Sequence, residues 1–326
     1  MARALALISG GLDSGLAAKL VKDQGVEVIG ICFKSAFFGC DRAVKMCEQI
    51  DIPLKVVDFS EEHLEMVKNP KHGYGKNMNP CIDCHAMMLN YAGKLMKELE
   101  ADFIITGEVL NQRPMSQNRQ ALDIVKKESG YEEYILRPLC AKNLPETWME
   151  KQGLVDREKL LDISGRGRKV QMELAEKWNI KEYPSPAGGC KLTDPGFSKR
   201  LKDLLTHNKE AKPQDIDILN IGRHFRINEN VKIISTRTQD EFKMLKTMIK
   251  EGDYIFDTLD VTGSTVVLRG KPTEEDIILA ARIAARYSKA REEKNVRVKY
   301  RIYNENKYNI LTVEPALDDE IAKYMV

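Results

Sequence analysis

Short apolar runs alternate with helical patterns through the first third of the chain. The strand-like runs cover residues 4–8, 26–32, 54–59 and 103–106. The helical patterns cover residues 16–23, 41–49 and 86–99. Such an alternation is typical of a parallel sheet with helices on both faces. The pattern therefore predicts an α/β fold built on a doubly wound parallel sheet.

Polar sequence follows the ends of these predicted strands. In doubly wound sheets ligands bind beyond the carboxyl ends of the strands, so we expect the segments after residues 8, 32, 59 and 106 to meet around one site. The last of these segments, residues 107–117, has too few apolar positions to pack by itself. We predict that it covers a bound nucleotide.

A second unit is predicted from about residue 200 onward. Lys and Asn accumulate and the hydrophobic content falls between residues 198 and 215. Strand-like segments follow at 232–235, 264–268 and 308–313, with helical patterns at 238–250 and 274–290. We therefore expect two domains, residues 1–200 and residues 201–326, of which the second is a smaller α+β domain.

The segment Ser9-Gly10-Gly11-Leu12-Asp13-Ser14 leads directly from the first apolar run into a helix. Glycine permits backbone angles that a side chain forbids, so the backbone can close around an anion. Free N–H groups and the positive dipole end of a helix N-terminus attract phosphate, and the two serine hydroxyls can add donors. No Gly-Lys-Ser/Thr follows, which excludes the phosphate loop of GTPases. The segment predicts a pyrophosphate-binding loop, with an ordinary glycine turn as the alternative.

Composition limits the location of the protein and its disulfide content. A chain of 326 residues with 43% hydrophobic residues can bury a core in each of two domains. No apolar stretch approaches the roughly 20 residues that span a membrane, and the first strand begins almost at the N-terminus, so we expect a cytoplasmic protein with no membrane attachment. Seven cysteines in a reducing compartment argue against a disulfide framework.

A basic stripe lies between residues 282 and 307, although the net charge of +2 is uninformative. Its basic residues are Arg282, Arg286, Lys289, Arg291, Lys294, Arg297, Lys299, Arg301 and Lys307. They are interleaved with Tyr287, Tyr300 and Tyr303 and followed by Tyr308. Because Lys and Arg neutralise phosphates and aromatic rings stack on bases, the stripe predicts an RNA-binding surface. A solvated helix face is the alternative.

Three cysteines stand apart from the apolar patterns. Cys81 and Cys84 form a C-x-x-C pair at the start of a helical pattern, followed by His85, and Cys190 lies in a loop rich in Pro and Gly. A helix N-terminus lowers the pKa of a thiol and so favours the thiolate. The other cysteines fall beside apolar patterns and are expected to pack as small hydrophobic residues; they are Cys32, Cys40, Cys47 and Cys140.

Three interpretations of Cys81, Cys84 and Cys190 stay open. Three thiolates can hold a 4Fe-4S cluster and leave one iron free for an exogenous sulfide. A zinc ion with His85 as its fourth ligand would be structural and inert. In a cluster-free site, one cysteine would carry a persulfide and another would release the sulfur by forming a disulfide.

Four motifs together resemble the PP-loop ATP pyrophosphatase family. They are SGGLDS at 9–14, NPC-x-x-CH at 79–85, TGEVL-x-QRPMSQ at 106–117 and PSPAGGC at 184–190. Within the family the chain looks most like the iron-sulfur-dependent tRNA 4-thiouridine synthetases, although it lacks the N-terminal THUMP domain of the persulfide-type enzymes. Segments between residues 222 and 291 are similar to the RNA-binding domain of the ribosome quality-control NFACT proteins.

The resemblance implies an ATP-dependent tRNA sulfurtransferase. ATP would be cleaved to AMP and pyrophosphate, AMP would activate a uridine carbonyl oxygen, and sulfur would replace that oxygen to give 4-thiouridine. Catalysis would rest on Asp13, Cys81, Cys84 and Cys190, with the three thiolates holding a [4Fe-4S] cluster. The pyrophosphate and Mg²⁺ would be held by Ser9, Gly10, Gly11, Asp13 and Ser14. The nucleoside would be flanked by Phe33 and Gly107, with Arg113 and Gln117 as further phosphate contacts.

Several alternatives stay open beside this interpretation. The product could be 2-thiouridine, or the thiolation could use a persulfide without a cluster. A more distant alternative is an amidating PP-loop ligase with a structural zinc site, and an RNA-binding module without activity would leave SGGLDS unexplained. The sequence does not determine which uridine is modified, whether inorganic sulfide or a donor protein supplies the sulfur, or whether the chain forms a homodimer. Asn111 stands where we expect Gly, although Asn tolerates left-handed backbone angles.

Overall fold

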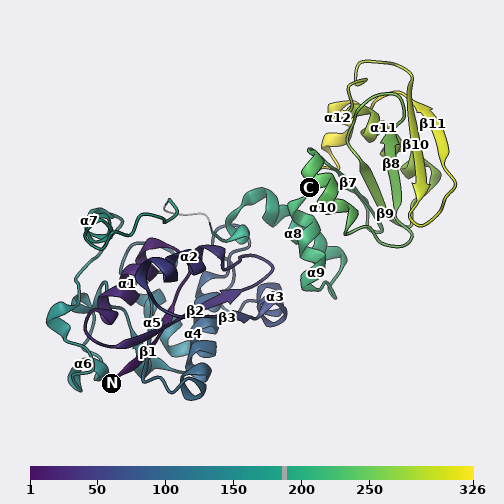
Figure 1. The fold of residues 1–326 in the computed structure, drawn as a ribbon. Coiled ribbons are helices and arrows are strands. Elements are labelled where there is room, and N and C mark those ends of the chain that lie inside the picture. The colour runs from purple at the N-terminus through teal and green to yellow at the C-terminus, as the bar shows by residue number, and fades with distance from the viewer. Residues whose placement is uncertain (186–188) are drawn as a thin grey trace. The chain divides into compact units, whose positions relative to one another are not determined.

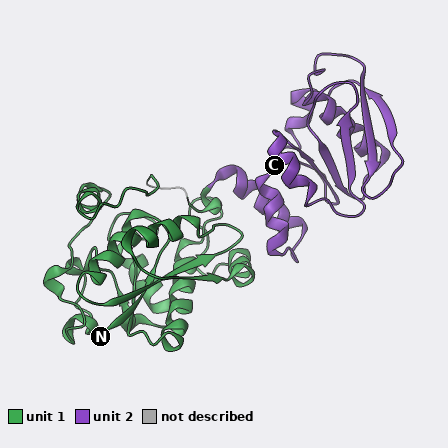
Figure 2. Ribbon diagram, in the orientation of Figure 1, with its two compact units in different colours: residues 1–193 green, residues 194–326 purple. Residues whose placement is uncertain are grey.

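The computed structural model describes residues 1–185 and 189–326. The chain divides into two compact units, residues 1–193 and residues 194–326 (Figure 2). The boundary expected at about residue 200 falls inside helix α8 (Pro195–His207).

The first unit is built on a five-stranded sheet in the order β3-β2-β1-β4-β5, in which every pairing is parallel (Figure 1). Its strands are β1 (Arg3–Leu7), β2 (Glu27–Lys34), β3 (Leu54–Asp58), β4 (Phe103–Ile105) and β5 (Ile135–Leu136). Its helices are α1 (Leu12–Lys22), α2 (Asp41–Ile50), α3 (Ser60–Lys68), α4 (Cys81–Glu98), α5 (Arg119–Glu128), α6 (Trp148–Lys151) and α7 (Lys169–Lys177). This topology confirms the predicted doubly wound α/β fold.

Helices cover both faces of this sheet. Successive side chains of a strand point to opposite faces, and β1 divides its residues accordingly. Ala4 and Ala6 pack in a core with apolar residues of α1, α2 and α7. Leu5 packs in a second core with apolar residues of α4 and α5. The near-continuous apolar sequence of β1 follows from this burial on both sides.

The strand order places the topological switch point of the sheet beside β1. From β1 the chain builds outward to β2 and β3 on one side, and β4 and β5 lie on the other side. Ligands of such sheets bind beyond the carboxyl ends of the strands at this switch point. The segments that follow β1 and β4 are the SGGLDS motif and residues 107–117, the two segments for which nucleotide binding was predicted.

The second unit contains a six-stranded sheet in the order β11-β10-β8-β9-β7-β6, in which every pairing is antiparallel. Its strands are β6 (Arg223–Asn228), β7 (Val231–Ser235), β8 (Tyr254–Thr258), β9 (Val266–Gly270), β10 (Val296–Ile302) and β11 (Asn309–Val313). Its remaining helices are α9 (Pro213–Ile216), α10 (Gln239–Lys246), α11 (Glu274–Arg286) and α12 (Asp318–Ala322). The alanine-rich face of α11 packs against the sheet and forms the core of this unit. Among the described residues, no helix has the length and apolar character needed to cross a membrane.

Candidate active site and RNA-binding surface

The SGGLDS motif (the PP-loop, residues 9–14) connects β1 to α1. Gly10 has a left-handed backbone with φ of +76°, and a Cβ added there would lie 2.4 Å from the backbone carbonyl carbon of Arg42. Gly11 is extended, with φ of −79°, and precedes the first residue of α1. Glycine is therefore required at the first position both for its backbone angle and for its close packing, whereas the second glycine keeps an ordinary angle.

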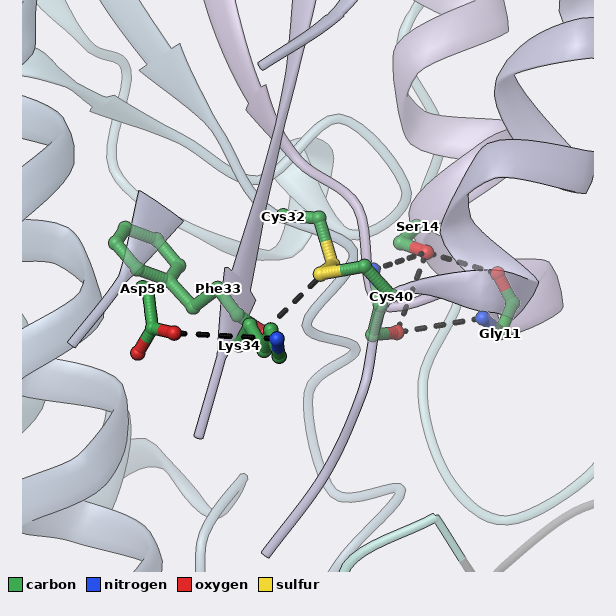
Figure 3. Close-up of a disulfide and its surroundings, with 8 residues drawn as sticks. Gly11, Ser14, Cys32, Phe33, Lys34, Cys40 and Asp58 are labelled. Carbon is green, nitrogen blue, oxygen red and sulfur yellow. Dashed lines mark hydrogen bonds and ion pairs between the residues drawn. A yellow bond between two sulfur atoms is a disulfide. The ribbon is translucent and has the colours of Figure 1, made fainter. Parts of the chain in front are cut away.

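The serine hydroxyls of the PP-loop hold the loop in shape. Ser14 Oγ donates to the Gly11 carbonyl oxygen at 2.8 Å, as Figure 3 shows, and accepts from the Ser9 amide at 3.3 Å. The Gly11 amide donates to Ser9 Oγ at 3.3 Å. These bonds order a loop of backbone N–H groups at a helix N-terminus, the arrangement that binds phosphate. Direct contact of either hydroxyl with phosphate stays a prediction.

Asp13 presents one carboxylate oxygen without a partner. Its Oδ2 accepts a hydrogen bond from Gln112 Nε2 at 2.7 Å, whereas its buried Oδ1 has no hydrogen-bond partner among the described residues. Gln112 in turn accepts from Gln171 Nε2 at 3.4 Å. An unpaired carboxylate oxygen beside a phosphate-binding loop suits Mg²⁺, a hard cation that prefers oxygen ligands. Gln112 and Gln171 were absent from the sequence-based site, because their role depends on contacts between distant segments.

Residues 107–117 (the covering loop) begin in direct contact with the PP-loop. A Cβ added at Gly107 would lie 2.5 Å from the Ser14 nitrogen and 2.7 Å from the Asp13 carbonyl carbon. Farther along, the Asn111 amide donates to the Gln117 carbonyl oxygen at 2.7 Å and closes the loop. Asn111 has a left-handed φ of +62°, so it adopts the conformation for which glycine was expected. Contact of Gly107 or Gln117 with a nucleotide stays a prediction.

Cys81, Cys84 and Cys190 (the thiol site) lie close enough to influence one another electrostatically. Burial raises the pKa of Cys84 well above its usual value, and the neighbouring Cys190 and Cys81 raise it further. Burial also raises the pKa of Cys190 to about 11, with a further contribution from Cys81. The expectation that Cys81 and Cys84, at the start of a helix, have lowered pKa values is wrong, because burial raises the pKa of both thiols. Among the described residues, no three His, Cys, Asp or Glu side chains are close enough together to hold a metal ion.

The covering loop also reaches the thiol site. Burial raises the pKa of Cys81, while hydrogen bonds with Asn79 and Ser116 and the charge of Arg113 act in the opposite direction. The charge of Arg113 likewise opposes the rise at Cys190. Gln112 and Arg113 are neighbours in sequence. Gln112 donates a hydrogen bond to Asp13, whereas the charge of Arg113 influences the pKa of the thiols. One loop therefore joins the PP-loop to the thiol site, although contact of Arg113 with phosphate stays a prediction.

Two buried polar residues beside the thiol site were not predicted from the sequence. Glu108 accepts hydrogen bonds from Arg137 Nε at 2.8 Å and Thr106 Oγ1 at 3.1 Å, and its Oε1 lies 3.0 Å from His85 Nδ1. Burial alone would raise the pKa of Glu108, but Arg137 and His85 outweigh it and lower the pKa to about 2.

His63 is fully buried, and its Nε2 lies 3.3 Å from Cys84 Sγ.

Cys32 and Cys40 form a disulfide, with their Cα atoms 6.0 Å apart (Figure 3). The expectation that these two cysteines pack as free thiols is therefore wrong. Cys32 lies near the end of β2 and Cys40 directly precedes α2, so the disulfide holds together the two ends of the loop that connects these elements. Cys47 and Cys140 are buried and free, as expected. Residues 186–188 of the predicted cysteine loop lie outside the described residues.

The loop closed by this disulfide (the bridged loop, residues 33–39) packs against the thiol site. Phe37 and Phe38 contact the His63 ring, with centroids 5.5 and 5.2 Å away. The Phe37 carbonyl oxygen accepts from the Lys191 amide at 3.3 Å, next to Cys190. Phe33 is buried against Phe59, with ring centroids 5.1 Å apart, so contact of this ring with adenine stays a prediction.

In the second unit, acidic residues neutralise part of the basic stripe. Arg282 binds Glu320, Arg286 binds Asp318 and Arg297 binds Asp260, each through two side-chain hydrogen bonds. Tyr300 stacks on Phe256 in the core, with ring centroids 5.3 Å apart. The surface on which basic residues and aromatic rings alternate is therefore smaller than predicted.

Three basic and aromatic residues of the stripe, Lys299, Arg301 and Tyr308, lie together on the β10–β11 hairpin. Tyr308 keeps 53% of its surface exposed. Lys299 Nζ and the Arg301 guanidinium carbon lie 5.7 and 5.5 Å from the centre of its ring. An exposed ring flanked by two cations can stack on a base while the cations face phosphates. We call these three residues the Tyr308 platform.

The fold and the loops define the class of the first unit. A doubly wound sheet whose first strand leads through an SGG-x-DS loop into a helix, with an unpaired aspartate oxygen at that helix, is a nucleotide-binding domain of the PP-loop type.

Comparisons with known proteins agree with this class. Residues 1–147 match the family model described as thiamine biosynthesis protein (ThiI), and residues 222–325 match the model described as NFACT protein RNA binding domain. The tRNA-specific 2-thiouridylase MnmA of Rhizobium leguminosarum bv. trifolii is 32% identical over 131 residues, which cover 34% of this chain and 33% of that protein. MnmA of Geotalea uraniireducens is 28% identical over 233 residues, covering 63% and 60% respectively. The chain thus spans only about a third of the length of the first of these relatives.

A solved 4-thiouridine synthetase in complex with RNA and bound ATP has 18% sequence identity and a TM-score of 0.38, over 67% of this chain and 52% of that one. The family models and the relatives agree with the motifs quoted from the sequence. The first unit is therefore similar to PP-loop proteins that include tRNA thiolation enzymes, and residues 222–325 of the second unit are similar to the NFACT RNA-binding domain.

Proposed function

We propose that this chain is an ATP-dependent tRNA uridine sulfurtransferase that forms 4-thiouridine. One observation carries the proposal: adjacent residues of the covering loop join the PP-loop to the thiol site, Gln112 through its bond to Asp13 and Arg113 through its effect on Cys81 and Cys190. The covering loop reaches both the PP-loop, which would activate the nucleotide, and the thiol site, which would supply the sulfur. This arrangement suits a reaction in which activation and sulfur attack occur on the same uridine.

The chain's own residues account for the activation step. The backbone N–H groups of the PP-loop and the N-terminus of α1 would bind the pyrophosphate portion of ATP. Asp13 Oδ1, which has no partner among the described residues, would hold Mg²⁺ on those phosphates. The uridine carbonyl oxygen attacks the α-phosphate of ATP, pyrophosphate leaves, and the oxygen departs as AMP once sulfur has bonded to the ring carbon.

The thiol site would supply the sulfur. Cys81, Cys84 and Cys190 influence one another electrostatically, and three cysteine thiols are the donor set that an iron-sulfur cluster requires. Among the described residues these side chains are not close enough together to hold a metal ion, so cluster binding would require them to move together. These residues would hold a [4Fe-4S] cluster, which supplies an iron that can carry sulfide when it is bound. Arg113 would favour the thiolate forms of Cys81 and Cys190. Inorganic sulfide or a donor protein would provide the sulfur.

The second unit would bring the tRNA to this site. The NFACT-type domain and the Tyr308 platform support an RNA partner, because an exposed ring between two cations serves both base stacking and phosphate neutralisation. The curated relatives favour one alternative product. They are named 2-thiouridylases, so replacement of O2 instead of O4 is the second candidate.

Mass spectrometry of tRNA nucleosides tests the reaction and the product together. Bulk tRNA from a strain lacking this chain should lose 4-thiouridine, and the purified protein with ATP and sulfide should restore it and release pyrophosphate. Loss of 2-thiouridine instead would select the second candidate. Unchanged thiolated nucleosides in both experiments would refute the proposed function.

Metal and sulfur analysis tests the thiol site separately. Anaerobically purified protein should be brown and contain about four irons per chain when fully loaded. Replacing Cys81, Cys84 or Cys190 by Ala should remove both iron and thiolation, whereas Cys47→Ala and Cys140→Ala are matched controls that should keep both. Stoichiometric zinc without iron in active protein, or full activity of metal-free protein with a persulfide donor, would contradict the cluster.

A further inference from the structure

His63 is enclosed so completely that its ring orientation is fixed. The side chain has no exposed surface. Its ring stacks on Phe59 at a centroid distance of 4.8 Å and an interplanar angle of 11°, and Phe37 and Phe38 contact it edge-on. Three aromatic rings from two segments therefore leave the imidazole with one orientation, which directs Nε2 to Cys84.

The two ring nitrogens have different surroundings. Nε2 lies 3.3 Å from Cys84 Sγ, and the buried Nδ1 has no hydrogen-bond partner among the described residues. The ring is fully buried among aromatic side chains, where an unpaired positive charge would be costly, so we take the imidazole as neutral with a single proton. A buried N–H without an acceptor is rarer in proteins than an unpaired acceptor. We therefore assign the proton to Nε2, where it meets the sulfur.

An unpaired buried nitrogen is costly for a residue that only fills space. Leaving a buried polar group without a partner costs roughly 1–3 kcal/mol, and a phenylalanine among three aromatic rings would avoid that cost. The polar atom at this position is thus explained by its contact with Cys84 and not by packing.

We propose that His63 is a positioning residue of the thiol site, whose Nε2–H donates a hydrogen bond to the Cys84 sulfur and fixes that sulfur for its work as a thiolate. Hydrogen bonds to a ligating sulfur orient the ligand and set the potential of the centre that it holds. The inference rests on the proposed function only in taking Cys84 as a working thiolate. The first experiment below requires neither cluster nor activity.

Nuclear magnetic resonance tests the hydrogen bond in the reduced, metal-free, full-length protein. The chain has five histidines, so selective ¹⁵N labelling of histidine gives few signals, and His63→Gln identifies the one that belongs to His63. We expect the Nε2–H tautomer, and we expect the Nε2 resonance to shift in Cys84→Ala but not in Cys47→Ala. A proton on Nδ1, or the same His63 spectrum with and without the Cys84 sulfur, would overturn the proposal.

Cluster-loaded protein provides the second test. Gln can donate a hydrogen bond to the sulfur, whereas Phe fills the space without a donor, so His63→Gln and His63→Phe form a matched pair. His63→Phe should lower the midpoint potential, because the N–H dipole that favours the added electron is lost, and His63→Gln should restore most of it. Equal potentials for the two variants would contradict the inference. Strong ¹⁵N hyperfine coupling to His63 in the reduced protein would instead make this residue an iron ligand and overturn the hydrogen-bond assignment.

The outcomes separate the two proposals. A His63 signal that responds to Cys84→Ala in protein that binds no iron would support the positioning role while refuting the cluster. Urea unfolding followed by tryptophan fluorescence checks that each variant is folded, since both tryptophans, Trp148 and Trp178, lie in the first unit.

Discussion

Replacing Glu108 by Gln tests whether the stability of the folded first unit depends on the buried charge near the start of the covering loop. Glu108 is 7% exposed and accepts hydrogen bonds from Arg137 and Thr106. Gln has the same shape and keeps an oxygen acceptor, but it has no charge. The comparison therefore isolates the electrostatic contribution of the carboxylate from its packing.

The pKa of Glu108 gives the size of the effect. The pKa falls from its ordinary value of 4.5 to about 2 in the folded chain. A carboxyl pKa lowered by this much stabilises the folded state by about 3 kcal/mol at neutral pH. Because the folded-state pKa is the lower one, this stability is complete above about pH 5 and is lost as the pH falls toward 2. Glu108→Gln should therefore be about 3 kcal/mol less stable than the natural protein at pH 7.

Urea unfolding at a series of pH values measures this difference. Tryptophan fluorescence reports on the first unit alone, because Trp148 and Trp178 both belong to it. The gap in unfolding free energy between the two proteins should shrink to less than half by pH 3, since a protonated Glu108 resembles Gln. A gap that stays constant from pH 7 to pH 3, or the absence of a gap at pH 7, would refute the reasoning.

Three further predictions follow from the structure. Asp13→Ala should slow AMP formation by at least about a hundredfold, or roughly 2.7 kcal/mol, with an unchanged urea midpoint; a comparable rate of ATP-dependent thiolation would show that the PP-loop is wrongly assigned. Tyr308→Ala should weaken tRNA binding about tenfold through lost stacking, whereas Ile310→Ala, at another exposed apolar position of the hairpin, should have little effect; equal losses would remove stacking as the cause. Cys40→Ser should destabilise the first unit by about 2–3 kcal/mol, the amount expected for opening so short a loop. Alkylation of unfolded, unreduced protein should label five of the seven cysteines, and labelling of all seven would contradict the bridge.

Periodicity predicted the parallel sheet because burial determines the sequence of its strands. The apolar runs at 4–8 and 26–32 correspond to β1 and β2, since both strands are covered on two faces and tolerate few polar residues. In the second unit, β6, β8 and β10 were missed. Strand β10 was hidden within the basic stripe, where charge obscured the strand pattern.

Motifs predicted the site only where the functional residues lie close together in the sequence. The PP-loop is such a case, because one turn and one helix start form it. Gln112, Gln171 and His63 could not be found in this way, since their partners lie far away in the chain and become neighbours only on folding. The Cys32–Cys40 bridge was missed because burial explains a cysteine beside an apolar run as well as a disulfide does.

The two kinds of sulfur in the first unit differ in their access to solvent, and this affects how a sample can be handled. The bridge sulfurs belong to buried residues, Cys32 at 2% and Cys40 at 8% exposure, whereas Cys81, Cys84 and Cys190 are only partly buried. Thiol–disulfide exchange requires an attacking thiolate to reach a bridge sulfur. A mild reductant applied to the folded protein should therefore return the three partly buried cysteines to thiols well before it opens the bridge, so one preparation can contain an intact disulfide and a fully reduced thiol site together.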